Sequence, residues 1–468
     1  MTTFAQPRPW TGPHVAGELP GPLSAELLAR QDRRESSART YPRHLPIALA
    51  EGRGSFVKDV DGNVFIDFLM GAGVLSLGHN HPELVAAVHR QLDLLTHGLD
   101  FPTPVKDEFT AAQLAMLPGD LGRRMKAHFC GPTGANAVEA AIKLCKTATG
   151  RGEVVSFRGG FHGSTHAAMA LSGLVAAKEP VRNTMPGVHF FPYCSPSRCP
   201  DGPVPGSCAW DCAGQLERAL TDELGGIARP AAVLLELVQG EGGVVPARPE
   251  FVRRLRALTR ALDVPLVVDE VQTGGGRTGT WFAFEQYGIE PDVVVASKAL
   301  GGLGLPVALI LYDARLDTWA PGAHIGTFRG NQLAFAAGTE AVRVVRRDGV
   351  LENVRRRGRQ IDGLLAPLAG LPWVREVRGR GLMWGVELAD AGGRPAGERA
   401  AEVQARALRG GLIVERGGRD DRVVRLLPPL NVTADVVEDA CALLLRAVTE
   451  CGPDRFVPPV SGRYRPGT

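Results

Sequence analysis

The fold of this chain is decided by the stretch Asp292-Val-Val-Val-Ala-Ser-Lys-Ala-Leu-Gly-Gly302. Residues 293–296 form an unbroken apolar run, mostly β-branched, which is typical of a strand buried on both faces of a sheet. Lys298 follows this run directly and is the only lysine after Lys178. A desolvated lysine can lose its proton and attack a carbonyl, which an arginine cannot do. Lys298 is therefore either a Schiff-base candidate or a salt-bridged lysine at a strand end.

Four other runs that we expect to be strands precede this one along the chain, at residues 126–130, 153–157, 232–237 and 265–269. Helical patterns separate these runs between residues 65 and 340. Strands that alternate with helices predict a mostly parallel sheet covered by helices, which is the α/β fold class.

The remaining segments predict a second, smaller lobe. Residues 47–69 consist of short alternating runs separated by glycine turns, as in a small antiparallel meander. We therefore expect residues 1–64 to form an N-terminal arm and part of the small domain. Residues 65–340 should form the large domain, and residues 341–468 should form a C-terminal small domain of the α+β type.

Composition excludes several classes of function. The chain has 468 residues, 44% hydrophobic and 22% charged, and its net charge of +3 arises from balanced signs without a strong basic block. Neither a nucleic-acid partner nor a membrane surface is therefore expected. No apolar stretch has the length of a membrane span and the N-terminus lacks an apolar leader segment, so we expect a cytoplasmic protein.

Four of the eight cysteines lie close together, namely Cys194, Cys199, Cys208 and Cys212. Their spacing is not that of a common zinc module, in which short Cys-x-x-Cys pairs dominate. We expect a loop of reduced cysteines rather than a metal site, and its role stays open.

The turn after residues 126–130 reads Gly131-Pro-Thr-Gly-Ala135 and leads into a strongly helical run that ends at Gly150. Free backbone N–H groups at Gly134 and Ala135, with the hydroxyl of Thr133 nearby, suit a phosphate at the N-terminus of a helix. The alternative is an ordinary glycine turn with a capping residue.

Two other strand ends also carry candidate residues. Phe161, flanked by glycines, could stack on one face of a planar cofactor, and His162 beside it could bind the cofactor or be a core histidine. Glu236 interrupts an apolar strand, where a buried carboxylate needs a partner. Glu241 follows in a Gly-rich turn.

Asp269 ends the apolar run 265–269. A carboxylate at the end of a buried strand suits a buried cation, which could be either a pyridinium nitrogen or an arginine. A phosphate site, a stacking ring, an aspartate and a strand-end lysine, in this order, point to pyridoxal 5′-phosphate (PLP) as the cofactor.

The motif Asp269-Glu-Val-Gln-Thr-Gly-Gly-Gly-Arg-Thr-Gly279, with Ser297-Lys298 about thirty residues later, resembles the class III aminotransferases. The resemblance covers roughly residues 45–448. It implies the fold-type I architecture of PLP-dependent transferases, similar to aspartate aminotransferase. In that architecture a large, mostly parallel seven-stranded sheet domain is joined to a smaller α+β domain.

The resemblance also assigns roles. It implies that Lys298 binds the cofactor and shuttles a proton, that Asp269 holds the ring nitrogen, and that Gln272 holds the ring hydroxyl. The other cofactor contacts that it implies are Gly134, Ala135, Phe161, His162, Glu236 and, from a neighbouring subunit, Thr327. Glu241 and Arg425 resemble a gate pair, in which the arginine binds a substrate carboxylate and the glutamate neutralises that arginine when an ω-amine enters.

Within the class, several strings resemble the diaminobutyrate–2-oxoglutarate aminotransferases, among them Gly326-Thr-Phe-Arg-Gly-Asn-Gln332. Two positions depart from related patterns. Ser164 stands where ornithine-type members carry an arginine, which counts against ornithine as the substrate, and Gly275 stands where the class usually carries an aromatic residue.

We therefore expect transamination between the terminal amine of L-2,4-diaminobutyrate and 2-oxoglutarate, giving L-aspartate 4-semialdehyde and L-glutamate. The alternatives are a class III ω-aminotransferase for another diamine or ω-amino acid, and a PLP-dependent aminomutase. The expected partners are an amino donor, a 2-oxo acid acceptor and further copies of the chain in a homodimer or a larger homo-oligomer.

Overall fold

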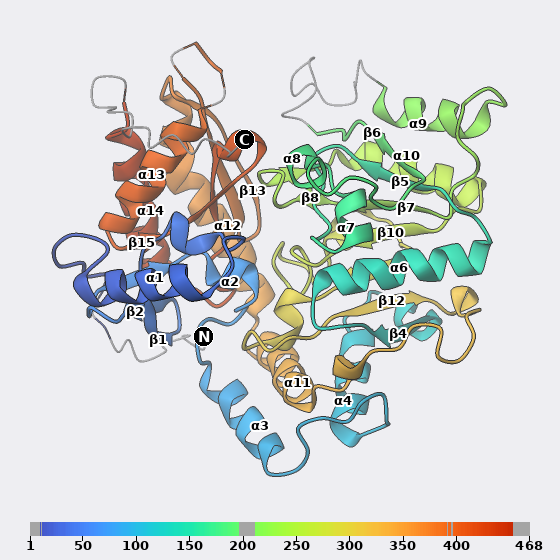
Figure 1. Ribbon diagram of the computed structural model, residues 1–468, viewed down its shortest axis with the longest axis horizontal. Helices are drawn as coiled ribbons and strands as arrows, with labels where there is room; N and C mark the ends of the chain where they lie inside the picture. Colours follow the sequence, from blue (N-terminus) through green and yellow to red (C-terminus); the bar gives the residue numbers. More distant parts are fainter. Residues whose placement is uncertain (1–9, 11, 196–210, 391, 395, 453–468) are drawn as a thin grey trace.

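The computed structural model describes residues 10, 12–195, 211–390, 392–394 and 396–452 (Figure 1). Its central feature is a seven-stranded sheet in the order β4-β12-β11-β10-β7-β5-β6. Neighbouring strands run parallel except around β12, which is antiparallel to both β11 and β4. The strands are β4 (Met125–Phe129), β5 (Val154–Phe157), β6 (Val188–Phe191), β7 (Ala232–Glu236), β10 (Leu266–Asp269), β11 (Val293–Ala296) and β12 (Leu309–Asp313).

Helices cover both faces of this sheet. Alternate residues of the central strands belong to two separate cores: Val267 packs with residues of α6 (Gly134–Thr149), whereas Val268 packs with residues of α10 (Pro249–Ala261). Both valines are fully buried. The unbroken apolar runs in the sequence follow from this burial on both faces.

The mostly parallel, seven-stranded sheet that the sequence predicts is confirmed, but two of its strands were not predicted. β6 is an edge strand whose residues are only partly buried, so its apolar signal is weak. β12 follows β11 without an intervening α-helix and runs in the opposite direction. The alternation of strands with helices therefore does not reveal it.

The smaller lobe combines the two ends of the chain, which Figure 1 shows in blue and in orange to red. β1 (Leu49–Arg53), β2 (Phe56–Asp59) and β3 (Val64–Asp67) form the expected antiparallel meander, and β15 (Leu412–Ile413) adds to it in parallel to β3. A second sheet has the order β13-β14-β17-β16. Its strands are β13 (Val374–Arg380), β14 (Met383–Leu388), β16 (Glu415–Gly417) and β17 (Val423–Leu426).

The remaining elements complete both lobes. The α-helices are α1 (Pro22–Arg34), α2 (Met70–Gly73), α3 (Pro82–Leu92), α4 (Pro104–Leu114), α5 (Leu121–Arg124), α7 (His166–Leu171), α8 (Val175–Lys178), α9 (Cys212–Thr221), α11 (Gln332–Arg347), α12 (Val350–Leu365), α13 (Gly397–Arg409) and α14 (Ala434–Thr449). A short hairpin pairs β8 (Val238–Gln239) with β9 (Val245–Pro246). Among the described helices, none combines the length and the apolar character that a membrane span requires.

Loops at the ends of the sheet strands contact the smaller lobe. Gly418 N donates a hydrogen bond of 2.8 Å to the carbonyl oxygen of Glu241, and Leu382 N donates one of 3.0 Å to that of Arg277. In parallel sheets, ligand sites lie beyond the carboxyl ends of the strands. The seam between the lobes is therefore where the predicted site residues should meet.

Candidate active site

Lys298 lies two residues after the end of β11 and begins a short 3₁₀ helix, Lys298–Gly301. Its backbone is left-handed, with φ of +36°, which a residue with a side chain adopts only at a cost. Among the described residues, no carboxylate lies within 4.0 Å of its ammonium group, which argues against a salt-bridged strand-end lysine. Burial lowers its pKa, so the reactive neutral amine forms more easily.

Asp269, at the end of β10, is 4% exposed and is paired with a histidine. One of its carboxylate oxygens lies 2.7 Å from Nδ1 of the buried His162, and the other accepts a hydrogen bond from Val271 N. Burial lowers the pKa of His162, but the hydrogen bond and the charge of Asp269 outweigh burial and raise it. The geometry therefore pairs the carboxyl group of Asp269 with the imidazole of His162 inside the protein.

Glu236 has a positioning role in the structure. Its two carboxylate oxygens accept hydrogen bonds from Phe161 N (2.9 Å) and Gly240 N (3.0 Å). It thereby joins the loop after β5 to the turn that carries Glu241. Burial raises the pKa of Glu236 to about 7.

The start of α6 has the geometry that the predicted anion site requires. Among the described residues, the N–H groups of Gly134 and Ala135 donate to no protein acceptor, as expected in the first turn of a helix. The hydroxyl of Thr133 donates to Asn136 Oδ1 (2.8 Å), which ties the turn together. A Cβ at Gly134 would lie 2.9 Å from the side chain of Val271, so only glycine lets the helix approach the loop after β10 this closely.

Arg425 is 1% exposed and lies between two glutamates. Its Nη1 and Nη2 donate to the two carboxylate oxygens of Glu241, at 2.9 and 3.0 Å. Nη2 also lies 2.8 Å from Oε2 of Glu415. The side chain of Gln272 forms a hydrogen bond with Glu241, so the predicted gate pair and the predicted ring contact are neighbours.

Glu415, at the start of β16, was not predicted as a site residue. The signal was present, because Glu415 directly follows the buried run 412–414, as Glu236 and Asp269 follow theirs. Tyr41, which forms a hydrogen bond with Glu415, carried no signal of its own in the sequence. It lies in a 3₁₀ turn of the N-terminal segment, Tyr41–Arg43, which only the folded chain brings to this place.

Among the described residues, no hydrogen bond or ion pair joins Thr327 to another predicted site residue. Thr327 is exposed, and its carbonyl oxygen lies 2.8 Å from Nε2 of His97.

Ser164 and Gly275 lie in loops after β5 and β10, and a Cβ at Gly275 would come within 2.7 Å of Ala299, next to Lys298. The glycine therefore allows a close approach of that loop to Ala299, the residue after the lysine.

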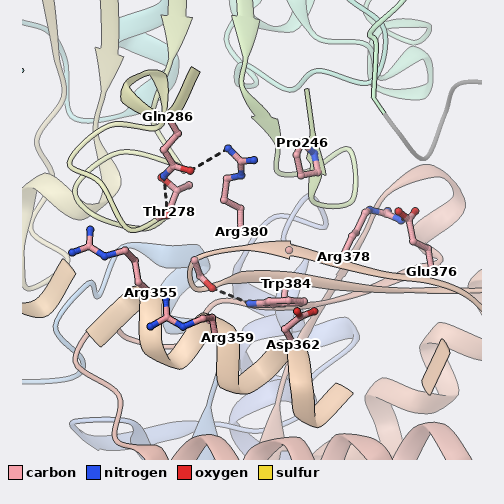
Figure 2. A pocket seen from close by; sticks show the side chains of 13 residues that line it. Pro246, Thr278, Gln286, Arg355, Arg359, Asp362, Glu376, Arg378, Arg380 and Trp384 are labelled. Carbon is pink, nitrogen blue, oxygen red and sulfur yellow. Dashed lines mark hydrogen bonds and ion pairs between the residues drawn. The ribbon is translucent and has the colours of Figure 1, made fainter. Parts of the chain in front are cut away.

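A separate cavity of about 540 Å³ lies between the segment around Gln286 and the elements α12 and β13 (Figure 2). The arginines that line it have partners: Arg380 donates to Gln286 Oε1, Arg355 to the carbonyl oxygen of Gly279, and Arg378 to that of Val244. Lys298 does not line it. The cavity belongs to the seam that joins the lobes and not to the lysine site.

The residues around Lys298 fit PLP. An anion site at a helix N-terminus suits a phosphate, and buried Asp269 suits a protonated ring nitrogen. Gln272 Oε1 is buried without a partner among the described residues, so this side chain has capacity for a ring substituent. The described residues contain no cluster of three or more side chains able to hold a metal ion, while Cys199 and Cys208 lie outside the described residues.

Comparisons with known proteins agree with this arrangement. The family model "Aminotransferase class-III" matches residues 37–448. A diaminobutyrate–2-oxoglutarate aminotransferase of Rhizobium meliloti (strain 1021) is 48% identical over 92% of this chain and 93% of its own. The enzyme with that name from Haemophilus influenzae (strain ATCC 51907 / DSM 11121 / KW20 / Rd) is 45% identical over 88% of this chain and 92% of its own.

Solved structures are similar over nearly the whole chain. An ornithine aminotransferase from Toxoplasma gondii superposes with a TM-score of 0.80 and 28% identity, covering 92% of this chain and 95% of its own. An amine transaminase from an uncultivated Pseudomonas species, in its PLP-bound form, gives a TM-score of 0.81 and 26% identity, covering 90% and 98%. The family match and these relatives show that this chain belongs to the class III aminotransferases.

Proposed function

We propose that this protein exchanges the terminal amine of L-2,4-diaminobutyrate with 2-oxoglutarate, giving L-aspartate 4-semialdehyde and L-glutamate in a reversible, PLP-dependent transamination. The observation that carries this proposal is the bidentate pair of Arg425 with Glu241, whose charges act on Lys298. A site that must accept both a diamine and a dicarboxylate needs a cation that can be exposed or masked. The names of the most similar relatives support the same pair of substrates.

Each side chain around the cofactor then has its own role. Bound at this site, PLP supplies the electron sink that allows an amine to be transferred. Lys298, with its lowered pKa, accepts and returns the proton of the substrate carbon. Asp269 would hold a proton on the ring nitrogen, His162 orients Asp269, and Gln272 would contact the ring hydroxyl.

Other residues position the cofactor and the substrates. Gly134 and Ala135 would bind the phosphate through their N–H groups, and Phe161 would cover one face of the ring. Glu236 fixes the loop that carries Phe161. Arg425 would bind the α-carboxylate of glutamate or 2-oxoglutarate through two parallel hydrogen bonds. Glu241 occupies those donors when a diamine enters instead.

A panel of amine donors tests the proposal. Each donor is supplied with 2-oxoglutarate, and the glutamate formed is measured. Diaminobutyrate should give the highest kcat/KM, and ornithine should be a poor donor because Ser164 offers no cation for its carboxylate. If another diamine or ω-amino acid gives the highest kcat/KM, the proposed donor is wrong but the reaction is still a transamination. Amine exchange without a free 2-oxo acid would indicate an aminomutase.

Arg425→Lys should weaken binding of 2-oxoglutarate roughly tenfold to a hundredfold, because an ammonium cannot form both charge-assisted hydrogen bonds to one carboxylate. The half-reaction with diaminobutyrate should change far less. Stopped-flow measurement of each half-reaction checks this prediction. Equal losses in both half-reactions would place the carboxylate site elsewhere.

Glu241→Gln should shift selectivity in the opposite direction. The amide keeps the shape of the side chain but removes the charge that masks Arg425, so glutamate should gain over diaminobutyrate by roughly tenfold. Glu402→Gln is a matched control, because Glu402 pairs with Arg406 on α13 and makes no contact with Arg425 among the described interactions. An unchanged ratio in the Glu241 variant would remove Glu241 from the gate.

We also propose that the active form is at least a homodimer. The segments around His97 and Thr327 lie side by side, since Gly98 N donates to the carbonyl oxygen of Gly330 at 2.9 Å. Large apolar side chains are exposed on them: Leu94 78%, Phe101 67%, Ile325 77% and Phe328 68%. Such a patch on a water-facing surface favours an interface, and it would bring Thr327 to the partner's phosphate site.

Phe328→Asp should therefore produce inactive monomers, because a charge among these exposed apolar side chains opposes association. Sedimentation velocity and activity are measured together. The matched control is Leu224→Asp, since Leu224 is 92% exposed outside the patch. An active monomer of the unaltered protein at assay concentration would contradict the proposal.

A further inference from the structure

Two carboxylates lie beside the guanidinium group of Arg425, although a gate needs only one. Glu241 already takes both terminal nitrogens of its guanidinium, and Glu415 adds a second carboxylate 2.8 Å from Nη2. All three groups are largely removed from water. With both glutamates ionised, one positive charge faces two negative charges, and the cluster carries a net negative charge.

The two glutamates differ in how they are attached. Glu415 on β16 lies directly opposite Arg425 on β17, in an antiparallel pair held by backbone hydrogen bonds. Glu241 lies in the turn between β8 and β9, which reaches the smaller lobe only through contacts such as the one from Gly418 N. If a substrate carboxylate displaces Glu241, Glu415 therefore stays beside the arginine.

We propose that Glu415 is a permanent second counter-ion of Arg425 and determines how strongly the site prefers an ammonium-bearing donor over a carboxylate-bearing one. This inference rests on the proposed function and deepens it. With Glu415 in place, a carboxylate that binds Arg425 must share the guanidinium with a fixed negative charge. A donor with a second ammonium group brings instead a charge that the cluster attracts.

The contacts of Glu415 with Arg425 and Tyr41 favour the ionised form that this role needs, and burial opposes it. Burial raises its pKa, and the charge of Glu241 adds to the rise although Arg425 opposes it. Tyr41 forms a hydrogen bond with the same carboxyl group, and its hydroxyl is the donor when Glu415 is ionised. Burial lowers the pKa of Lys298; the charges of Glu241 and Glu415 oppose this effect and the charge of Arg425 adds to it, so the cluster also acts electrostatically on the reacting amine.

The test is Glu415→Gln, which keeps the shape of the side chain and its ability to accept from Tyr41 but removes the charge. Dissociation constants for glutamate and for diaminobutyrate are measured in separate stopped-flow half-reactions of the holoenzyme. Glutamate should bind roughly tenfold more tightly, and diaminobutyrate roughly tenfold more weakly, as expected for the loss of one charge at this distance.

Glu402→Gln, the control with an arginine partner in the same lobe, should leave the ratio unchanged. Glu415→Asp draws the carboxylate back from Arg425 and should shift the ratio in the same direction by less, which keeps the test available if the glutamine variant folds poorly. Equal changes for both substrates, or weaker binding of glutamate, would overturn the inference. The glutamate measurement needs no diaminobutyrate, so a failure of the proposed donor is recognised separately.

Discussion

Lys298→Ala should abolish turnover, with a loss of roughly 10⁴-fold or more in kcat, because the variant lacks both the nucleophile and the group that moves the proton. The structure gives a physical reason to expect this loss at Lys298. Lys298 is held in a left-handed conformation at the end of a buried strand, with a lowered pKa. Steady-state rates with glutamate and a 2-oxo acid measure the effect.

The covalent attachment can be examined in the same preparation. Borohydride reduction of the unaltered protein, followed by peptide mass mapping, should place a pyridoxyl group on Lys298. Lys58→Ala serves as the control, because Lys58 lies on β2 and pairs with Glu51 in the smaller lobe. A pyridoxyl group on any other lysine, or an active Lys298→Ala variant, would contradict the assignment.

Asp269→Ala should lower kcat by roughly 10²–10³-fold, the size typical of removing one group that stabilises charge in the reaction. Asp269 would keep a proton on the ring nitrogen, and without its carboxylate the site has no buried negative charge at that point. Cofactor should still bind, more weakly, through the start of α6 and Lys298. Single-turnover rates and the absorbance of bound cofactor separate the two effects.

A structural role for Asp269 would give a different result, and Asp292 provides the comparison. Asp292 is equally buried and pairs with Arg256 (2.5 Å) and Arg315 (2.6 Å), away from the site. Asp292→Asn should lower the free energy of unfolding by about 3–5 kcal/mol, because it leaves a buried arginine with a weakened partner, while the rate per folded molecule is kept. If the Asp269 variant behaves in this way, its role is structural.

The sequence by itself determined the class of fold and of reaction. Runs such as 265–269 and 293–296 must be buried on both faces, and that requirement alone predicts a parallel sheet under helices. Asp269 ends one of these runs and Lys298 follows the other after Ser297, and chemically demanding side chains at strand ends are signals that the local sequence contains. The class III motif that contains Asp269 could be recognised for the same reason.

The tertiary structure alone decided which of these residues meet. Glu236 accepts hydrogen bonds from Phe161 N and Gly240 N, and the first of these partners is 75 residues away in the sequence. The local sequence does not predict such partners. Strand β12 was missed because it returns antiparallel without a helix. Glu415 contacts Arg425 only because of the pairing register of the short strands β16 and β17. Tyr41, which also contacts Glu415, lies near the other end of the chain. Charge balance at a buried group depends on distances in space, which the order of residues along the chain does not contain.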